Sequence, residues 1–289
     1  MGYKIITDST IDMDHKMIEE LGLTVVPLRF TIDGKTYKDK ADLSDMPTET
    51  FYAKLREGKM STTSQINADE FTRVFEPVLQ GGEDVLYIAF SSGLSGTCQS
   101  AFIARDELKE KYPERKIYVF DSLCASLGEG LLVYHAAMLK RAGTDIDSLY
   151  KWLGENVLKL CHWFTVDDLN HLKRGGRVSA AAAFLGTMLS IKPVLHVDDE
   201  GRLIPMEKAK GRAKSIRALL EHMKATAIEP EKQVIFISHG DAPEEAEGLA
   251  QMVRDTFGCK EVRVGNIGPV IGAHSGPGTV ALFFVGSPR

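Results

Sequence analysis

Two hydroxyl-rich segments are the strongest candidates for chemistry in this chain. Residues 91–97 read Ser-Ser-Gly-Leu-Ser-Gly-Thr and lie between an apolar run over 85–90 and a helical pattern that begins near Cys98. A strand-to-helix loop of this kind offers hydroxyls and unpaired backbone N–H groups at a helix N-terminus, which favour a carboxylate or a phosphate. A second cluster, Ser-Thr-Thr-Ser-Gln at 61–65, also precedes a predicted helix. We therefore predict that two polar loops converge on one anion; ordinary turns capped by their own hydroxyls are the alternative.

Acidic residues follow two other predicted strands. Asp8 comes directly after the run over 3–7, and Asp121 follows the run over 117–120. Ligands of open α/β sheets lie beyond the carboxyl ends of the strands. Because carboxylates repel an anion, we interpret Asp8 and Asp121 as groups that orient loop hydroxyls and backbone N–H groups, with simple strand-end capping as the alternative.

Glycine-rich segments of the second half supply cationic candidates. Arg174 and Arg177 flank two glycines, before an alanine-rich helix predicted over 179–191. Residues 267–279 contain too much glycine and proline for a helix, so we predict a loop that holds His274. An imidazole beside a crevice can donate a hydrogen bond to a carboxylate and can gain charge near neutral pH, although a structural role is the alternative.

A serine hydrolase is the competing class of protein. Ser91, Ser92 or Ser95 could meet a histidine such as His239 or His274. The GxSxG pattern of a nucleophile elbow is not satisfied, however. The chain also has no P-loop motif and no GxGxxG motif after a strand, so its own sequence gives no support for ATP or NAD binding.

Composition and charge exclude several classes of partner. The chain has 289 residues, 44% of them hydrophobic, which is enough for one large or two ordinary domains. A net charge of -5 argues against nucleic acid. The four cysteines form no CxxC pair, and no group of residues has metal-ligand spacing, so we expect no metal. No signal-peptide core is present, and the longest apolar run, 180–191, is too short for a membrane span, which predicts a soluble cytoplasmic protein without an integral membrane segment.

The elements that must position these residues follow a clear order. Short β-branched runs alternate with amphipathic helical stretches in the first half, including a predicted strand over 24–32, which predicts an α/β fold with a mainly parallel sheet and flanking helices. The second half has a predicted strand over 162–166, an antiparallel hairpin around residues 198–201, and further helices and strands, typical of a mixed α/β domain. We expect two domains, 1–158 and 159–289, with a crevice between them.

Eight segments, in order along nearly the whole chain, carry a resemblance to a known family. They are DST at 8–10, TSQ at 63–65, SSGLSGT at 91–97, FDS at 120–122, RGGR at 174–177, SIKP at 190–193, HGD at 239–241, and the glycine-rich stretch 268–279. Together they resemble the DegV family of bacterial fatty-acid-binding proteins, whose two α/β domains hold the lipid between them. Several members act as the B subunit of fatty acid kinase and present the acyl carboxylate to an ATP-binding partner that makes acyl phosphate.

The resemblance implies a set of residues for the carboxylate. Thr63 and Ser92 match the hydroxyl positions that bind it, and His274 matches the histidine near the same head group. Ser91 and Ser64 are supporting neighbours.

The resemblance also implies what surrounds that site. Arg174, Arg177 and Arg202 become candidates for contact with a phosphate or with the kinase partner. The protein is then expected to be a lipid carrier and not an enzyme, with a bound long-chain fatty acid, no cofactor, and the ATP-binding subunit of a fatty acid kinase as its partner. A small-molecule hydrolase that uses a loop serine stays the alternative.

Overall fold

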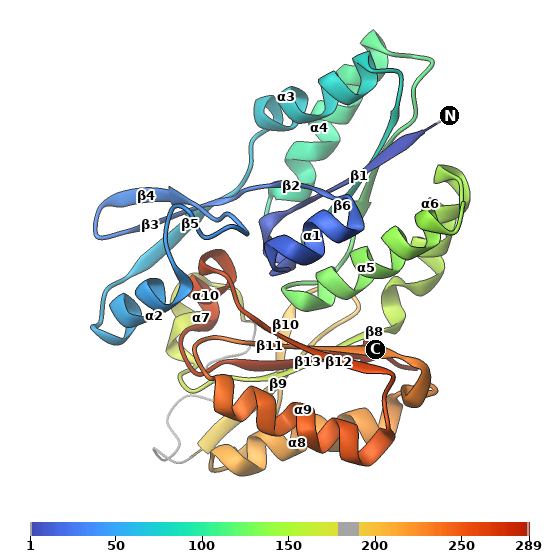
Figure 1. The fold of residues 1–289 in the computed structure, drawn as a ribbon. Coiled ribbons are helices and arrows are strands. Elements are labelled where there is room, and N and C mark those ends of the chain that lie inside the picture. Colours follow the sequence, from blue (N-terminus) through green and yellow to red (C-terminus); the bar gives the residue numbers. More distant parts are fainter. Residues whose placement is uncertain (1, 179–190, 288) are drawn as a thin grey trace.

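The computed structural model describes residues 2–178, 191–287 and 289, and its first half is built on a parallel sheet (Figure 1). The strand order is β2 (Thr24–Val26), β1 (Tyr3–Asp8), β6 (Asp84–Ala89), β7 (Ile117–Asp121). Every residue of β6 is buried, as expected for a parallel strand covered on both faces. The helices that accompany this sheet are α1 (His15–Leu21), α3 (Ala68–Gln80), α4 (Thr97–Lys111), α5 (Leu127–Arg141) and α6 (Ile146–Asn156). Two 3-10 turns lie at Ser9–Ile11 and Val157–Lys159.

The second half is built on a mixed sheet of six strands. Their order is β10 (Leu203–Lys210), β9 (Ile191–Val197), β8 (Leu160–Thr165), β13 (Val280–Val285), β11 (Val234–His239), β12 (Glu261–Asn266). Helices α8 (Arg212–Thr226) and α9 (Pro243–Phe257) cover the outer face of this sheet, and α5 packs on its inner face (Figure 1). The described part of this half also contains two short helices, α7 (Asn170–Gly175) and α10 (Pro269–Ser275), and a 3-10 turn at Pro230–Lys232.

A small antiparallel sheet, which the sequence analysis did not predict, projects from the first half. It has the order β4 (Lys35–Lys38), β3 (Arg29–Ile32), β5 (Ser61–Ser64), and helix α2 (Thr48–Arg56) lies beside it. The single strand predicted over 24–32 is wrong because Pro27 separates β2 from β3, and the two strands join different sheets.

The predicted fold class is confirmed: a parallel sheet with flanking helices is followed by a mixed α/β part. Two local predictions are wrong. Residues 61–64 form strand β5, because Phe30 pairs with Thr63 in the antiparallel ladder. Residues 269–275 form helix α10, because Pro269 occupies its first position, where no N–H is needed. The helix predicted over 179–191 lies outside the described residues, except for Ile191, which begins β9.

Each half of the chain packs one helix against elements of the other half. Helix α5, from the first half, contacts β8, β11 and β13, while α10, from the second half, contacts α2, β3 and β5. The division at 158 and 159 stays a prediction. Over the ranges that the structure describes, no helix combines the length and the apolar character needed to cross a membrane.

A local prediction concerns the start of α3, the helix that follows β5 in the chain. The Asn67 side chain accepts a hydrogen bond from the backbone N–H of Glu70 at 2.9 Å, and Glu70 returns a bond to the Asn67 backbone, forming a capping box. Asn67→Ala should lower the free energy of unfolding by about 1 kcal/mol. Urea denaturation tests this, and Asn67→Asp, which keeps the acceptor, should stay within a few tenths of a kcal/mol of the wild type. An equal loss in both variants would contradict the capping role.

Candidate functional site

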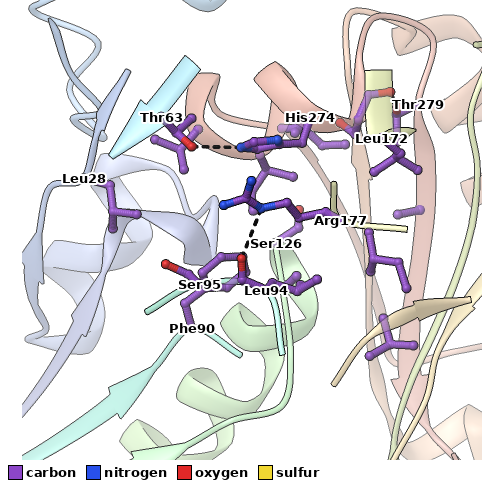
Figure 2. Close-up of a pocket in the computed structure, with 18 of the residues that line it drawn as sticks. Leu28, Thr63, Phe90, Leu94, Ser95, Ser126, Leu172, Arg177, His274 and Thr279 are labelled. Atoms are coloured by element: carbon purple, nitrogen blue, oxygen red, sulfur yellow. Dashed lines mark hydrogen bonds between the residues drawn. The ribbon is translucent and has the colours of Figure 1, made fainter. Parts of the chain in front are cut away.

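A cavity of about 210 Å³ lies where the two halves meet. Most of its wall is apolar and comes from both halves, including Leu28, Phe90, Leu94, Phe164, Leu172 and Phe283. Its polar groups include Thr63, Ser95, Ser126, His162, Arg177, His274 and Thr279. Figure 2 shows several of these residues around the opening between β5, α10 and the loop before α4.

Thr63 and His274, far apart in the sequence, form a hydrogen-bonded pair at this cavity. Thr63 Oγ1 lies 2.8 Å from His274 Nε2 (Figure 2). Strand β5 presents Thr63 inward, since its exposure alternates along Ser61–Ser64, and α10 carries His274 in its last turn. The structure therefore brings together two of the residues named for the carboxylate.

His274 is uncharged at neutral pH. Burial, helped by the nearby Arg177 guanidinium, lowers the pKa of its imidazole from 6.5 to about 4. Its Nδ1 is buried and has no hydrogen-bond partner among the described residues. The ring lies directly over Gly175 in α7, where any Cβ would overlap Nδ1, so only glycine fits beneath it. The pair thus offers neutral hydrogen-bonding groups rather than a fixed counter-charge.

The hydroxyl loop reaches the cavity through Ser95. Ser95 Oγ accepts a bond from the Thr97 backbone N–H at 3.2 Å, which begins α4, and lies 2.9 Å from Thr97 Oγ1. When Thr97 donates in that second contact, the Ser95 hydroxyl proton is free to point into the cavity. Ser95 and Gly96 both line it. Ser95 belongs to the 91–97 loop predicted to face an anion, although the family resemblance did not name it for the carboxylate.

Ser91 and Ser92 lie elsewhere in the same loop. Ser91 is fully buried, and its hydroxyl donates to the carbonyl of Gly201 at 2.8 Å. Ser92 is exposed, and its backbone N–H donates to Asp121 at 3.1 Å. Neither residue lines the cavity, whereas Ser64 does so at the end of β5. The structure does not bring the Ser91 or Ser92 side chain to the Thr63–His274 pair.

The three arginines separate into two groups. Arg177 extends between His274 and Leu94, whose carbonyl accepts from its Nε at 3.2 Å (Figure 2). Arg174 lies near it, 3.2 Å from His171 Nδ1. Both line a second pocket of about 200 Å³ that shares Thr63, Arg177 and His274 with the cavity and also contains Lys59. Arg202 lines neither space.

Helix α10 obtains the caps of its N-terminus from the other half of the chain. Its first residues have no side-chain cap of their own. Asp12 accepts from the Gly268 N–H at 2.8 Å, Asp39 accepts from the Val270 N–H at 3.3 Å, and the buried Tyr52 hydroxyl donates to the Ile267 carbonyl at 3.0 Å. Sequence reasoning missed these residues, because their partners lie more than 200 positions away.

The carboxyl ends of β1 and β6 are held by a buried network. Asp8 accepts from Thr10, from the Tyr87 hydroxyl at 2.6 Å and from the Phe90 N–H at 3.1 Å, as its predicted orienting role requires. The single Thr10 hydroxyl lies 2.5 Å from Asp8 and 2.8 Å from Glu129, so it can donate to only one of the two carboxyls. Burial and the Asp8 charge raise the pKa of Glu129 well above its usual value.

The geometry does not favour the hydrolase. No hydrogen bond joins Ser91, Ser92 or Ser95 to His239 or His274 among residues 2–178, 191–287 and 289. Across the same residues no group of three or more His, Cys, Asp or Glu side chains could hold a metal ion. A mainly apolar cavity with hydroxyl groups, a neutral histidine and Arg177 at one end instead suits a molecule with one polar end and a long apolar part.

Comparisons with known proteins agree with this geometry. A family model described as "Uncharacterised protein, DegV family" matches residues 3–287. A DegV domain-containing protein of Clostridium perfringens is 47% identical over 99% of this chain and 98% of its own. Two solved structures are also similar. One is a DegV family protein from Thermus thermophilus described by its fatty acid binding (33% identity, 98% of this chain and 99% of that one, TM-score 0.89). The other is DegV, a fatty acid binding protein from Bacillus subtilis (30% identity, 98% of each chain, TM-score 0.85).

The cap of α10 predicts a pH effect on stability. Burial raises the pKa of Asp39 from 3.8 to about 7. Between these values the folded protein binds more protons than the unfolded chain, so this carboxyl costs stability as the pH rises. Asp39→Asn keeps an acceptor for the Val270 N–H but has no proton to lose. Relative to the wild type it should gain roughly 2 kcal/mol of unfolding free energy between pH 5 and pH 8.

Urea titrations at several pH values measure this difference. The matched control is Asp69→Asn, at an exposed position in the first turn of α3, which measures the effect of the same exchange outside the core. If the Asp39→Asn difference did not change between pH 5 and pH 8, Asp39 would not be a buried acid of raised pKa.

Proposed function

Because this chain belongs to the DegV family, we propose that it binds a long-chain fatty acid in the cavity between its halves. The observation that carries the proposal is the uncharged Thr63–His274 pair at one end of a mainly apolar space. The relatives described as fatty-acid-binding proteins, at 30% identity or more along almost the whole chain, support it.

The carboxylate is proposed to lie among Thr63, His274 and Ser95. If His274 Nε2–H donates to Thr63 Oγ1, the Thr63 hydroxyl can donate onward to a carboxylate oxygen. Ser95 supplies a second hydroxyl from the opposite side of the opening (Figure 2). A buried carboxylate needs two or three such donors, and hydrogen bonds to a charged group are stronger than those between neutral groups. Ser95 takes the place that the family resemblance assigned to Ser92.

The acyl chain is proposed to supply most of the affinity. Each buried CH₂ contributes about 0.8 kcal/mol before the entropy and desolvation costs of binding are subtracted. The phenylalanine and leucine side chains of the cavity wall are suited to this burial. The hydroxyl groups then fix which end of the ligand lies at the opening.

The second part of the proposal is that the bound carboxylate is offered to an ATP-dependent fatty acid kinase. In the proposed arrangement hydroxyl groups hold the carboxylate and Arg177 lines the same cavity, and the carboxylate oxygen stays available to attack a phosphoryl group. The pocket that contains Lys59, Arg174 and Arg177 adjoins the Thr63–His274 pair and suits the charge of such a group. The chain has no P-loop, so the ATP site is assigned to a partner. This activity belongs in the cytoplasm, where a kinase finds ATP.

Fatty acid binding can be measured directly. Organic extraction and mass spectrometry of the purified protein should find one fatty acid per chain, or one taken up after incubation with palmitic or oleic acid. Thr63→Val and Ser95→Ala should each weaken binding by about 10-fold to 100-fold, because each removes a donor to a charged group.

Thr36→Val is the matched control, since Thr36 is an exposed threonine of the same small sheet, on β4, and lines neither the cavity nor the adjoining pocket. It should bind as the wild type does. A protein that carries no fatty acid and takes none up would refute the proposal.

The kinase part has its own test. With ATP and fatty acid, this protein alone should give no acyl phosphate, detected as a hydroxamate after trapping with hydroxylamine. Addition of the ATP-binding subunit of a bacterial fatty acid kinase should produce it. Arg174→Ala should lower that rate about 10-fold or more, whereas Lys173→Ala, an exposed neighbour outside the pocket, should not. Acyl phosphate formed without the kinase subunit would overturn the carrier role.

A further inference from the structure

The part of the cavity wall that the mixed sheet supplies stops at one level of side chains. Phe283 of β13 pairs with His162 of β8, and both residues line the cavity. The next pair that faces the same way along these two strands is Val285 with Leu160, and neither of these lines the cavity. On the side of the sheet, the cavity therefore ends at the level of Phe283.

This level lies well away from the polar end of the cavity. Thr279 donates to the carbonyl of Ser275 at 3.0 Å, so it lies against the end of α10 next to His274. Ala281 and Phe283 follow along β13, every second residue facing the cavity. At roughly 3.4 Å per residue, Thr279 and Phe283 are about 14 Å apart along the strand. With carbon–carbon bonds of about 1.5 Å in a zigzag, that span corresponds to roughly ten carbons of an extended acyl chain.

The Phe283 ring has little room to move away from a ligand. It packs edge-on against the His162 imidazole, with ring centres 5.4 Å apart. Residue 128, at the start of α5, is glycine, and a Cβ there would lie only 2.7 Å from Cδ1 of Phe283. The backbone of α5 thus lies directly against the ring. A chain that reaches Phe283 meets a wall that cannot retreat without a shift of α5.

A separate space lies on the other side of this wall. Phe236 of β11 pairs with Phe283, and side chains directly opposite each other in an antiparallel pair have Cβ atoms about 5 Å apart. Phe236 lines a third pocket, of about 110 Å³, together with Leu127 and Met13. Phe283 does not line this third pocket, and Phe236 does not line the cavity. The two phenylalanines therefore lie at the partition between the two spaces.

We propose that Phe283 sets the length of the acyl chain that the cavity accepts, because its ring contacts the methyl end of the chain. The inference rests on the proposed function, since it names the ligand class of that same cavity. Up to the length at which the methyl group reaches the ring, each added CH₂ buries more apolar surface. A longer chain must displace the ring or pull the carboxylate away from the Thr63–His274 pair, and both cost affinity.

The test measures the affinities of straight saturated acids from dodecanoic to docosanoic acid, by displacement of a fluorescent fatty acid from the full-length protein. With the wild type, each two added carbons should raise affinity by up to about tenfold until an optimum, beyond which affinity should fall. Phe283→Ala removes a ring of six carbons, so the optimum should move to chains roughly four carbons longer.

Phe164→Ala is the matched control for this change. Phe164 also lines the cavity, but it pairs with Ala281, one level nearer to the polar end. The substitution removes the same atoms from the side of the chain and not from its end. It should weaken all the acids and leave the optimal length where it is. An optimum that Phe283→Ala leaves unchanged, or that both variants move equally, would overturn the inference.

Wild-type protein alone provides an independent readout if the Phe283→Ala variant does not fold. A saturated acid of the optimal length that carries a diazirine at its last carbon is bound and irradiated, and the labelled residue is identified by mass spectrometry. The label should be found on Phe283 or on its neighbours His162 and Gly128. A label on any other residue would overturn the inference. If the wild type binds no fatty acid at all, the proposed function itself fails.

Discussion

The docking of helix α10 on the other half of the chain is the interaction on which the site depends. The helix has no cap of its own, and Asp12 and Asp39 satisfy its first N–H groups, while Tyr52 holds the carbonyl just before it. Unpaired N–H groups at a buried helix end are costly, so the helix keeps this position. His274 consequently reaches Thr63 on β5. The same docking forms this part of the cavity wall, because both residues line the cavity.

The His274 imidazole at the polar end of the cavity is neutral because it is buried, and not because of its residue type. An exposed histidine would be partly charged at pH 6.5, yet burial and Arg177 keep His274 uncharged. Burial and the Asp8 charge likewise raise the pKa of Glu129 well above its usual value. Arg177 lines both the cavity and the adjoining pocket, whereas Lys59 and Arg174 line the adjoining pocket alone. A carboxylate would therefore meet the hydroxyl donors together with Arg177, and the other two cations only on the side of the proposed partner.

The sequence predicted the main architecture well, because alternating β-branched and amphipathic runs report on local structure. The family resemblance named Thr63 and His274 for the carboxylate, and the structure places these two side chains in one hydrogen-bonded pair. The sequence did not predict α10, because Gly and Pro usually end helices and the groups that cap this one come from distant residues. It could not show that Ser95 lines the cavity and Ser92 does not, because the direction in which each side chain of a short loop points depends on tertiary contacts.

The Thr63–His274 contact joins strand β5 of the first half to helix α10 of the second (Figure 2). A head group bound to both side chains would act as an additional tie between these elements, and its loss would leave them held by the direct Thr63–His274 bond and the α10 caps. Binding of a ligand would then make the junction between β5 and α10 stiffer, in addition to filling the cavity. A protein that touches both elements from outside can therefore distinguish the loaded from the empty state without any contact with the acyl chain.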